Sequence, residues 1–265
     1  MKLKNIFALA LLAVSFTACE TVDEDERFIG PVEFAAKKNV LIEDFTGQRC
    51  VNCPRATDAI LSLQNTYGHD HVIAVALHGG PLSLPATTPV GLATEESQEY
   101  NTKWKVDSWP KGMINRKGGL FEFSSWSAQV IYELQQEPEA KLNTTVNSFD
   151  KETGKLSISV DVTGNLTADA SLQVWLTENK IIKVQFMPDG PANPAYEHNH
   201  VFRSSVNGTW GEEIKMVKDE TLTKQYEYTF DAKNQWNPEN MSIVTFVSNE
   251  TNGVMQVIET PVIKK

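Results

Sequence analysis

The sequence is short of cysteine, of positive charge and of long hydrophobic runs, and these shortages limit what the protein can be. Three cysteines occur in 265 residues, so any cysteine chemistry is confined to three positions. Acidic residues outnumber basic ones, 34 to 24, and no Lys or Arg run interrupts the excess, which excludes nucleic acid as a partner. No Ser-His-Asp order, phosphate loop or paired-carboxylate site stands out. With 41% hydrophobic residues, the chain is neither disordered nor collagen-like.

The first residues have the pattern of an export signal. Lys2 and Lys4 precede an apolar stretch from Ile6 to Val14, which is too short for a resident transmembrane helix, and small residues then lead to Cys19. Cleavage before a cysteine resembles the lipobox of bacterial lipoproteins. We therefore expect residues 1–18 to be a lipoprotein signal peptide and Cys19 to carry the lipid. Ordinary secretion with a free Cys19 thiol is the alternative.

Residues 19–36 are predicted to be an acidic, flexible leader, because the segment from Glu20 to Arg27 is self-repelling. It resembles the acidic tag that sends some Gram-negative lipoproteins to the outer face of the outer membrane, and a simple tether is the alternative. The expected location is the outer membrane, anchored by the lipid, on its periplasmic or cell-surface face.

Residues 37–140 alternate the patterns of strands and helices. Asn39 to Thr46 reads as a buried strand, Pro54 to Tyr67 as an amphipathic helix, and His71 to Leu77 as an interior parallel strand, which together make one βαβ unit. A proline-rich insertion near 79–93 follows. A helix, a hairpin and a last helix are then predicted at 94–104, 113–123 and 126–136.

Residues 141–265 change to short alternating stretches with turn residues between them, which predicts an all-β, immunoglobulin-like sandwich domain. Pro188 to Gly211, rich in Pro, Asn and Gly, is predicted to be one long connection. The expected strands lie at 142–149, 155–162, 171–178, 181–186, 225–231, 241–248 and 254–258.

Cys50 and Cys53 form a Cys-x-x-Cys pair at the end of a predicted strand and the start of a predicted helix. Free amide N–H groups and the positive end of the helix dipole stabilise a thiolate on Cys50, and Arg49 adds a cation. Cys50 is then the attacking thiol and Cys53 the resolving one. An inert staple is the alternative, although so small a loop gives little entropic stabilisation. Zinc would need further ligands.

Three positions of this part resemble the thioredoxin fold family. They are the Cys-x-x-Cys pair itself, an acid six residues before it, Asp44, and a proline some sixty residues downstream, Pro110. The resemblance covers about Val40 to Gln136 and implies an α/β thioredoxin-like domain. It implies that Asp44 relays a proton to or from Cys53, and that Pro110 is a cis-proline whose preceding backbone pairs with a peptide. The residues beside the pair differ from those of thioredoxins, so no redox potential is carried over.

Three residues near the pair are candidates for contact with a substrate. Arg49 precedes the first cysteine, and Trp109 is bulkier than the residue that usually precedes the cis-proline, so it is predicted to shield the disulfide from large substrates. His78 ends the second predicted strand and should lie at the same sheet edge as Cys50. There it contacts a ligand or lowers the thiol pKa; capping a loop is the alternative.

His198 and His200 are weak candidates for metal ligands. On a strand, residues two apart share a face, so both imidazoles could converge with Glu197. No third ligand is identifiable, and a structural role at a domain seam is preferred. No cofactor is expected.

The whole arrangement is similar to the twenty-eight-kilodalton outer membrane protein family of Gram-negative surface lipoproteins. The supporting segments are Glu43–Gly47, Pro110–Arg116, Glu197–Arg203 and Trp210–Gly211. That family is described as surface proteins, sometimes adhesins or receptors. Two functions follow: a membrane-anchored thiol-disulfide oxidoreductase acting on protein thiols or disulfides, or a receptor or adhesin for a host or cell-surface ligand with a structural disulfide and ligand-binding loops.

Overall fold

The computed structural model describes residues 36–264. The signal peptide predicted at 1–18, the lipid predicted on Cys19 and the acidic leader up to residue 35 lie outside the described residues. The described helices are α1 (Cys53–Tyr67), α2 (Glu95–Lys103) and α3 (Trp126–Leu134). None of them is long and apolar enough to cross a membrane.

The strands of the described part fall into one large and two small sheets. Their bounds are β1 (Val40–Thr46), β2 (Val72–His78), β3 (Lys111–Ile114), β4 (Lys117–Phe121), β5 (Ala140–Asp150), β6 (Lys155–Gly164), β7 (Ala168–Glu178), β8 (Ile181–Gln185), β9 (Asn193–His198), β10 (Val201–Ser205), β11 (Glu212–Met216), β12 (Thr221–Thr229), β13 (Met241–Asn249) and β14 (Gly253–Pro261).

Local sequence signals explain the elements of the first half. Every residue of β1 is buried, as its apolar run predicts. Helix α1 carries Pro54 in its first turn, where a missing N–H costs nothing. Helix α2 begins with a capping box, because the Thr94 hydroxyl accepts from the Ser97 amide and the Ser97 hydroxyl accepts from the Thr94 amide. The strand predicted at 39–46 and the helices predicted at 54–67 and 94–104 are therefore confirmed.

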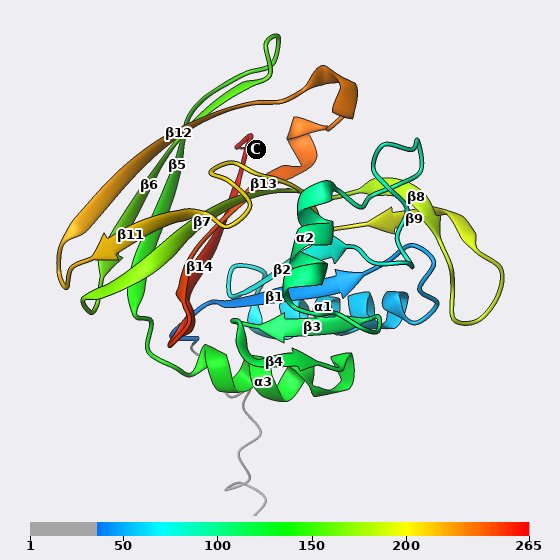
Figure 1. Cartoon of the computed structure of the whole chain (residues 1–265), viewed down its shortest axis with the longest axis horizontal. Coiled ribbons are helices and arrows are strands. Elements are labelled where there is room, and N and C mark those ends of the chain that lie inside the picture. Colours follow the sequence, from blue (N-terminus) through cyan, green and yellow to red (C-terminus); the bar gives the residue numbers. More distant parts are fainter. Residues whose placement is uncertain (1–35, 265) are drawn as a thin grey trace, which may run out of the picture. The chain divides into compact units, whose positions relative to one another are not determined.

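The large sheet has nine strands and combines parallel and antiparallel pairs. Its order is β14-β13-β7-β10-β2-β1-β3-β4, with β11 beside β7. Strands β1 and β2 are parallel, whereas β3 and β4 are antiparallel to their neighbours. Helix α2 covers one face, and α1 and α3 lie together on the other (Figure 1). The predicted α/β part with parallel strands is confirmed.

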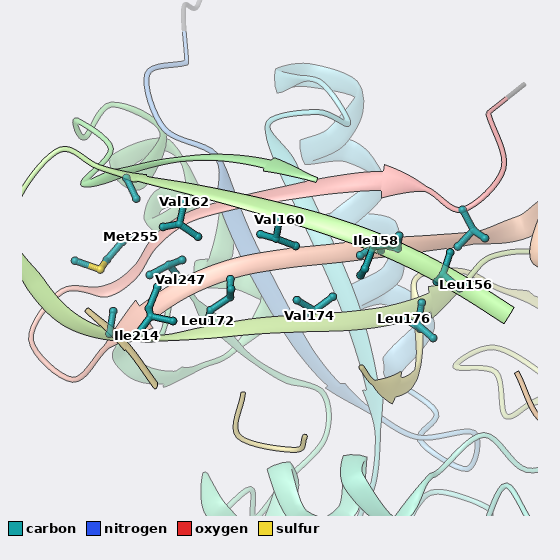
Figure 2. Close-up of a cluster of buried hydrophobic side chains, with 14 of the residues drawn as sticks. Leu156, Ile158, Val160, Val162, Leu172, Val174, Leu176, Ile214, Val247 and Met255 are labelled. Carbon is teal, nitrogen blue, oxygen red and sulfur yellow. The ribbon is translucent and has the colours of Figure 1, made fainter. Parts of the chain in front are cut away.

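The second half adds separate antiparallel sheets, β12-β6-β5 and β8-β9. The three-stranded sheet packs on the β7, β11, β13 and β14 side of the large sheet through one apolar core. Figure 2 shows side chains of β6, such as Ile158 and Val160, directed toward Leu172 and Val174 of β7. Each of these side chains is at most 1% exposed, so this core has the dry interior of two packed sheets.

The two halves share one sheet, which the sequence did not predict. Strand β10 pairs with β7 of the second half and, in parallel, with β2 of the first, where Val201 lies opposite Ala76. The stretch 188–211, predicted as one long connection, was wrongly interpreted, because it contains β9 and β10. Residues 36–265 form one compact unit, and the division into domains at residue 141 stays a prediction.

A buried ion pair of the first half contacts aromatic rings of the second half across this sheet. Arg116, in the turn after β3, donates two hydrogen bonds to the Glu43 carboxylate of β1, at 2.8 and 2.9 Å. The guanidinium also lies over the rings of Trp175 in β7 and Phe246 in β13. Glu43 is 1% exposed, so its charge depends on Arg116 for a partner.

We expect Arg116→Ala to lower the free energy of unfolding by about 3–5 kcal/mol, because it leaves the Glu43 carboxylate buried and unpaired. Urea denaturation measures the loss. The double variant Glu43→Gln/Arg116→Met, which removes both charges, should lose less of the free energy of unfolding. Lys37→Ala breaks an exposed ion pair with Glu137 and should cost under about 1 kcal/mol. An Arg116→Ala loss as small as that control would contradict this interpretation.

Candidate functional site: the Cys50–Cys53 disulfide

Cys50 and Cys53 are joined by a disulfide at the junction of β1 and α1, with their Cα atoms 5.4 Å apart. The chain leaves β1 at Thr46 and turns, with the Cys50 amide donating to the Gly47 carbonyl at 3.0 Å. Cys53 is the first residue of α1, so it lies at the positive end of the helix dipole. The strand-to-helix placement predicted from the sequence is confirmed.

The hairpin β8–β9 of the second half is bonded to the loop that carries Cys50. The Gln185 side-chain amide donates to the carbonyl of Cys50 at 2.9 Å and to that of Gly47 at 3.3 Å. The Phe186 amide donates to the Gln48 carbonyl at 2.8 Å. Cys50 is only 3% exposed and Cys53 2%. A substrate therefore reaches the disulfide only when this cover moves.

The exposed border of the site is cationic and apolar. Arg49 is exposed, and Val51 and Phe186 are 46% and 41% exposed. The insertion near 79–93 reaches the same loop, because the Gln48 side-chain amide donates to the Val90 carbonyl at 2.6 Å. Arg49 is thus exposed next to the covered Cys50, and its contact with a substrate stays a prediction.

The Trp109–Pro110 peptide bond is cis, as the resemblance implied. Pro110 is buried and directly precedes β3. Lys111 pairs with Phe45, so Pro110 lies beside the end of β1, where the Cys50 loop begins. The Trp109 ring lies against the backbone of Gly80, where a Cβ atom would clash with it, and its indole N–H donates to Asn101. Trp109 thus packs toward α2, and the hairpin β8–β9 covers the disulfide.

A small cavity of about 20 Å³ lies beneath the disulfide, between the sheet and α1. Asp44, Cys53, His78, Tyr196 and His198 are among the side chains that line it. The Asp44 carboxyl is buried, and its Oδ1 has no hydrogen-bond partner among the described residues. Burial raises the pKa of Asp44 to about 8. The structure therefore brings a protonatable acid to the cavity behind Cys53, as the resemblance implied.

His78 and His198 meet at this cavity, with ring centroids 5.5 Å apart. Burial lowers the pKa of His198 to about 4, and burial together with the nearby His198 lowers the pKa of His78 well below its usual value. His78 lies at the same sheet edge as the disulfide, as predicted, but it is 2% exposed. It faces the interior of the site, where an external ligand does not reach it.

His198 and His200 do not converge, so the metal hypothesis was wrong in its geometry. Strand β9 ends at His198, and His200 has a left-handed backbone (φ 57°). His200 lies near His69, and burial lowers its pKa to about 4. Within residues 36–264, no group of three or more His, Cys, Asp or Glu side chains is arranged to hold a metal ion.

Sequence reasoning missed Gln185 and Tyr196, which both line the cavity. Gln185 is separated from Cys50 by 135 positions, and Tyr196 belongs to a strand that was not predicted. No local pattern marks either residue. Only the pairing of β8 with β9, which follows from the fold, could have pointed to them.

A mixed sheet with parallel strands, a Cys-x-x-Cys disulfide at a strand-to-helix junction and a cis-proline before the strand that pairs with β1 are compatible with the thioredoxin-like class of proteins. The family model described as outer membrane protein Omp28 matches residues 97–265. This is more than half of the chain, so the protein belongs to the Omp28 family of outer membrane proteins. The matched residues follow the disulfide in sequence.

Two solved structures from Porphyromonas gingivalis are similar to this chain. HBP35 has 14% sequence identity and a TM-score of 0.64 over 85% of this chain and 76% of that one, which shows a shared fold. A domain of the outer membrane lipoprotein Omp28 has 25% identity and a TM-score of 0.34 over 46% of this chain and 87% of that one. No curated protein matches in sequence.

We expect Gln185→Ala to speed reduction of the Cys50–Cys53 disulfide by dithiothreitol several-fold, because it removes two of the hydrogen bonds that hold the hairpin on the Cys50 loop. The rate is measured by alkylating the released thiols under native conditions. Gln225→Ala, at an exposed position of β12, is the matched control. An unchanged rate in Gln185→Ala would show that the hairpin does not limit access.

The Asp44 carboxyl should make stability depend on pH. Its pKa is raised to about 8 in the folded state, so the folded state binds the proton more tightly than the unfolded state, and stability falls as pH rises from about 4 to about 8. The side chain in the Asp44→Asn variant is neutral at every pH, so this variant does not lose stability in this way as the pH rises. We expect its advantage over the wild type to grow by on the order of 1 kcal/mol per pH unit across that window.

Urea denaturation at a series of pH values measures this difference. Asp107→Asn, at an exposed carboxylate, should follow the wild-type curve. Parallel curves for Asp44→Asn and the wild type between pH 5 and 8 would show that Asp44 is not protonated in the folded protein.

Proposed function

We propose that this Omp28-family protein is an extracytoplasmic thiol-disulfide oxidoreductase that uses Cys50 and Cys53 and is anchored in the outer membrane by a lipid on Cys19. The observation that carries the proposal is the buried acid at the cavity behind Cys53. Asp44 has a pKa near neutrality, which suits a group that gives and takes protons at physiological pH. A purely structural disulfide does not require a buried acid of this kind.

The exchange proceeds in two steps. A substrate thiolate attacks Cys50 Sγ, forms a mixed disulfide with it and displaces Cys53 as a thiolate, which takes a proton from Asp44. A second substrate thiolate then attacks the substrate sulfur of the mixed disulfide and releases Cys50. The substrate thiols are oxidised to a disulfide, and the protein disulfide is reduced to the Cys53 thiol and the Cys50 thiolate, which exchanges protons with solvent. The reverse sequence reduces a substrate disulfide.

Other residues of the site supply binding. The backbone before Pro110 lies beside the Cys50 loop and pairs with an extended peptide, while Arg49 meets acidic groups of the substrate. Protein thiols or disulfides are the proposed substrates. The antiparallel second half, an immunoglobulin-like sandwich in our proposal, holds the cover and presents a surface to a partner on the periplasmic or cell-surface side of the membrane.

The burial of the disulfide favours a second candidate function. With both sulfurs covered, the fold can serve as a receptor or adhesin for a host or cell-surface ligand, and the Cys50–Cys53 pair is then structural. The loop at 79–93 and the loop between β8 and β9 form the contact surface in this case.

Trapping a mixed disulfide separates the two functions. We expect Cys53→Ser, which cannot resolve the intermediate, to attack oxidised glutathione or the disulfide of an unfolded protein through Cys50, to release one thiol and to accumulate a mixed disulfide on Cys50, as measured by mass spectrometry. Cys50→Ser should accumulate none at Cys53, because Cys53 faces the cavity between the sheet and α1. Asp44→Asn should slow reduction of the Cys50–Cys53 disulfide about 100-fold relative to the wild type at neutral pH.

The control for this trap is the reduced wild type, which should form the intermediate through Cys50 and resolve it through Cys53 without accumulating it. If Cys53→Ser collects no adduct while Cys50 still reacts in urea, the oxidoreductase proposal fails and the receptor is favoured.

A further inference from the structure

A larger cavity, of about 430 Å³, lies apart from the disulfide and is lined by segments from both halves of the described chain. Its walls come from the insertion near 79–93, from β8, β10 and β12, and from the segment 233–236 that follows β12. Cys50, Cys53 and Asp44 do not line it. Small-molecule sites have volumes of about 300–1,000 Å³, so this cavity has room for a small organic ligand.

Positive charge gathers around this cavity in a protein whose net charge is -10. Lys183, Arg203 and Lys233 line it, and none of the described lining residues is acidic. Arg203 is paired with the buried Glu178 at 2.8 Å, so its charge is compensated. Lys183 and Lys233 form no ion pair with a described residue, and the Lys183 ammonium donates to the Pro89 carbonyl. Two ammonium charges of this lysine-lined cavity therefore remain to attract an anion.

The nearby carboxylates are bonded to backbone amides. Glu96 of α2 accepts from the Ser205 amide at 3.1 and 3.2 Å, and Asp231 accepts from the Lys233 amide at 2.9 Å. Both carboxylates affect the hydroxyl of Tyr228, which lines the cavity. Neither forms an ion pair with the two lysine ammonium groups, so the place of a counter-charge is open to a ligand.

Most of the other lining side chains are neutral hydrogen-bonding groups. They are the hydroxyls of Thr87, Thr88, Thr94, Ser204 and Tyr228 and the side-chain amides of Asn234 and Gln235. Apolar side chains are few among the described lining residues, namely Ala86, Pro89 and Trp236. Hydroxyls and amides both donate and accept hydrogen bonds. Such a wall suits a ligand with several hydroxyl groups and disfavours a lipid or another apolar molecule.

We propose that the lysine-lined cavity binds a hydroxylated anion, namely a sugar that carries a carboxylate or a phosphate group. Lys183 and Lys233 hold the anionic group through charge-assisted hydrogen bonds, and the neutral side chains bind the sugar hydroxyls. Lysine acts as a point charge, so carboxylate and phosphate both fit. The inference goes beyond the proposed disulfide exchange and does not depend on it, because neither cysteine lines this cavity.

Titration of the whole oxidised protein with glucuronate, followed in an amide NMR correlation spectrum, tests the site. We expect saturable shifts of the amide signals of Thr87, Thr88 and residues 233–236, which line the cavity. A glucose phosphate is the second ligand, and saturable binding of either anionic sugar supports the site and identifies the anionic group that it accepts. Glucose has no charge to pair with the lysines and should bind at least about tenfold more weakly.

Lys183→Met and Lys233→Met each remove one ammonium group and keep an unbranched side chain. Each should raise the Kd for the bound anionic sugar about fivefold or more. Lys233 is exposed, so its variant serves as the test if loss of the Lys183 bond to Pro89 disturbs the insertion. Lys141→Met, at an exposed lysine of β5 that does not line the cavity, is the matched control and should keep the wild-type Kd.

The site is overturned if neither anionic sugar shifts these amide signals, or if both folded lysine variants keep the wild-type Kd. It is also overturned if glucose or acetate binds as tightly as the anionic sugar, because the cavity then does not recognise charge and hydroxyls together. The Cys53→Ser trap is read separately. A failed trap with an intact sugar titration removes the oxidoreductase proposal and leaves this site in place.

Discussion

The pairing of β10 with β2 is the contact on which the rest of the structure depends. The Ala76 amide donates to the His200 carbonyl at 2.8 Å, and β10 continues along β7, so one short strand makes a single sheet out of two parts. The same pairing places the end of β9 over the first half. Through it, His198 reaches the cavity and Gln185 reaches the Cys50 loop. The site is therefore built from both halves of the described chain.

Elements that depend on local signals could be predicted from the sequence. The apolar run of β2, the first-turn Pro54 of α1 and the Thr94 cap of α2 each reflect contacts within a few residues. Strand β10 could not be predicted in this way, because its five residues include the polar Arg203 and a bulge. Arg203 is tolerated there because it pairs with the buried Glu178, a partner that periodicity does not reveal.

The residues of the candidate site likewise include some that local sequence spacing predicted and some that it did not. Asp44, Cys50 and Cys53 lie within ten residues of one another, so their spacing carried the resemblance that pointed to them. His198 was noticed for the wrong reason, since its proximity to His200 suggested a shared strand face. The strand ends at His198, and its actual neighbour is His78, 120 positions earlier in the chain. The histidines were chosen as candidates from their residue type alone. Only the sheet topology shows which residues lie next to them.

Burial of the disulfide and burial of Asp44 are two parts of one constraint. A Cys53 thiolate released beneath the hairpin has little water around it, and desolvation makes that charge costly. An acid whose pKa burial raises to about 8 can give its proton to the thiolate at the place where the charge forms. Without exchange chemistry, the acid only lowers stability at neutral pH, because unfolding releases its proton. The cover over the disulfide thus increases the need for a proton donor behind it, and this favours a reactive pair over an inert one.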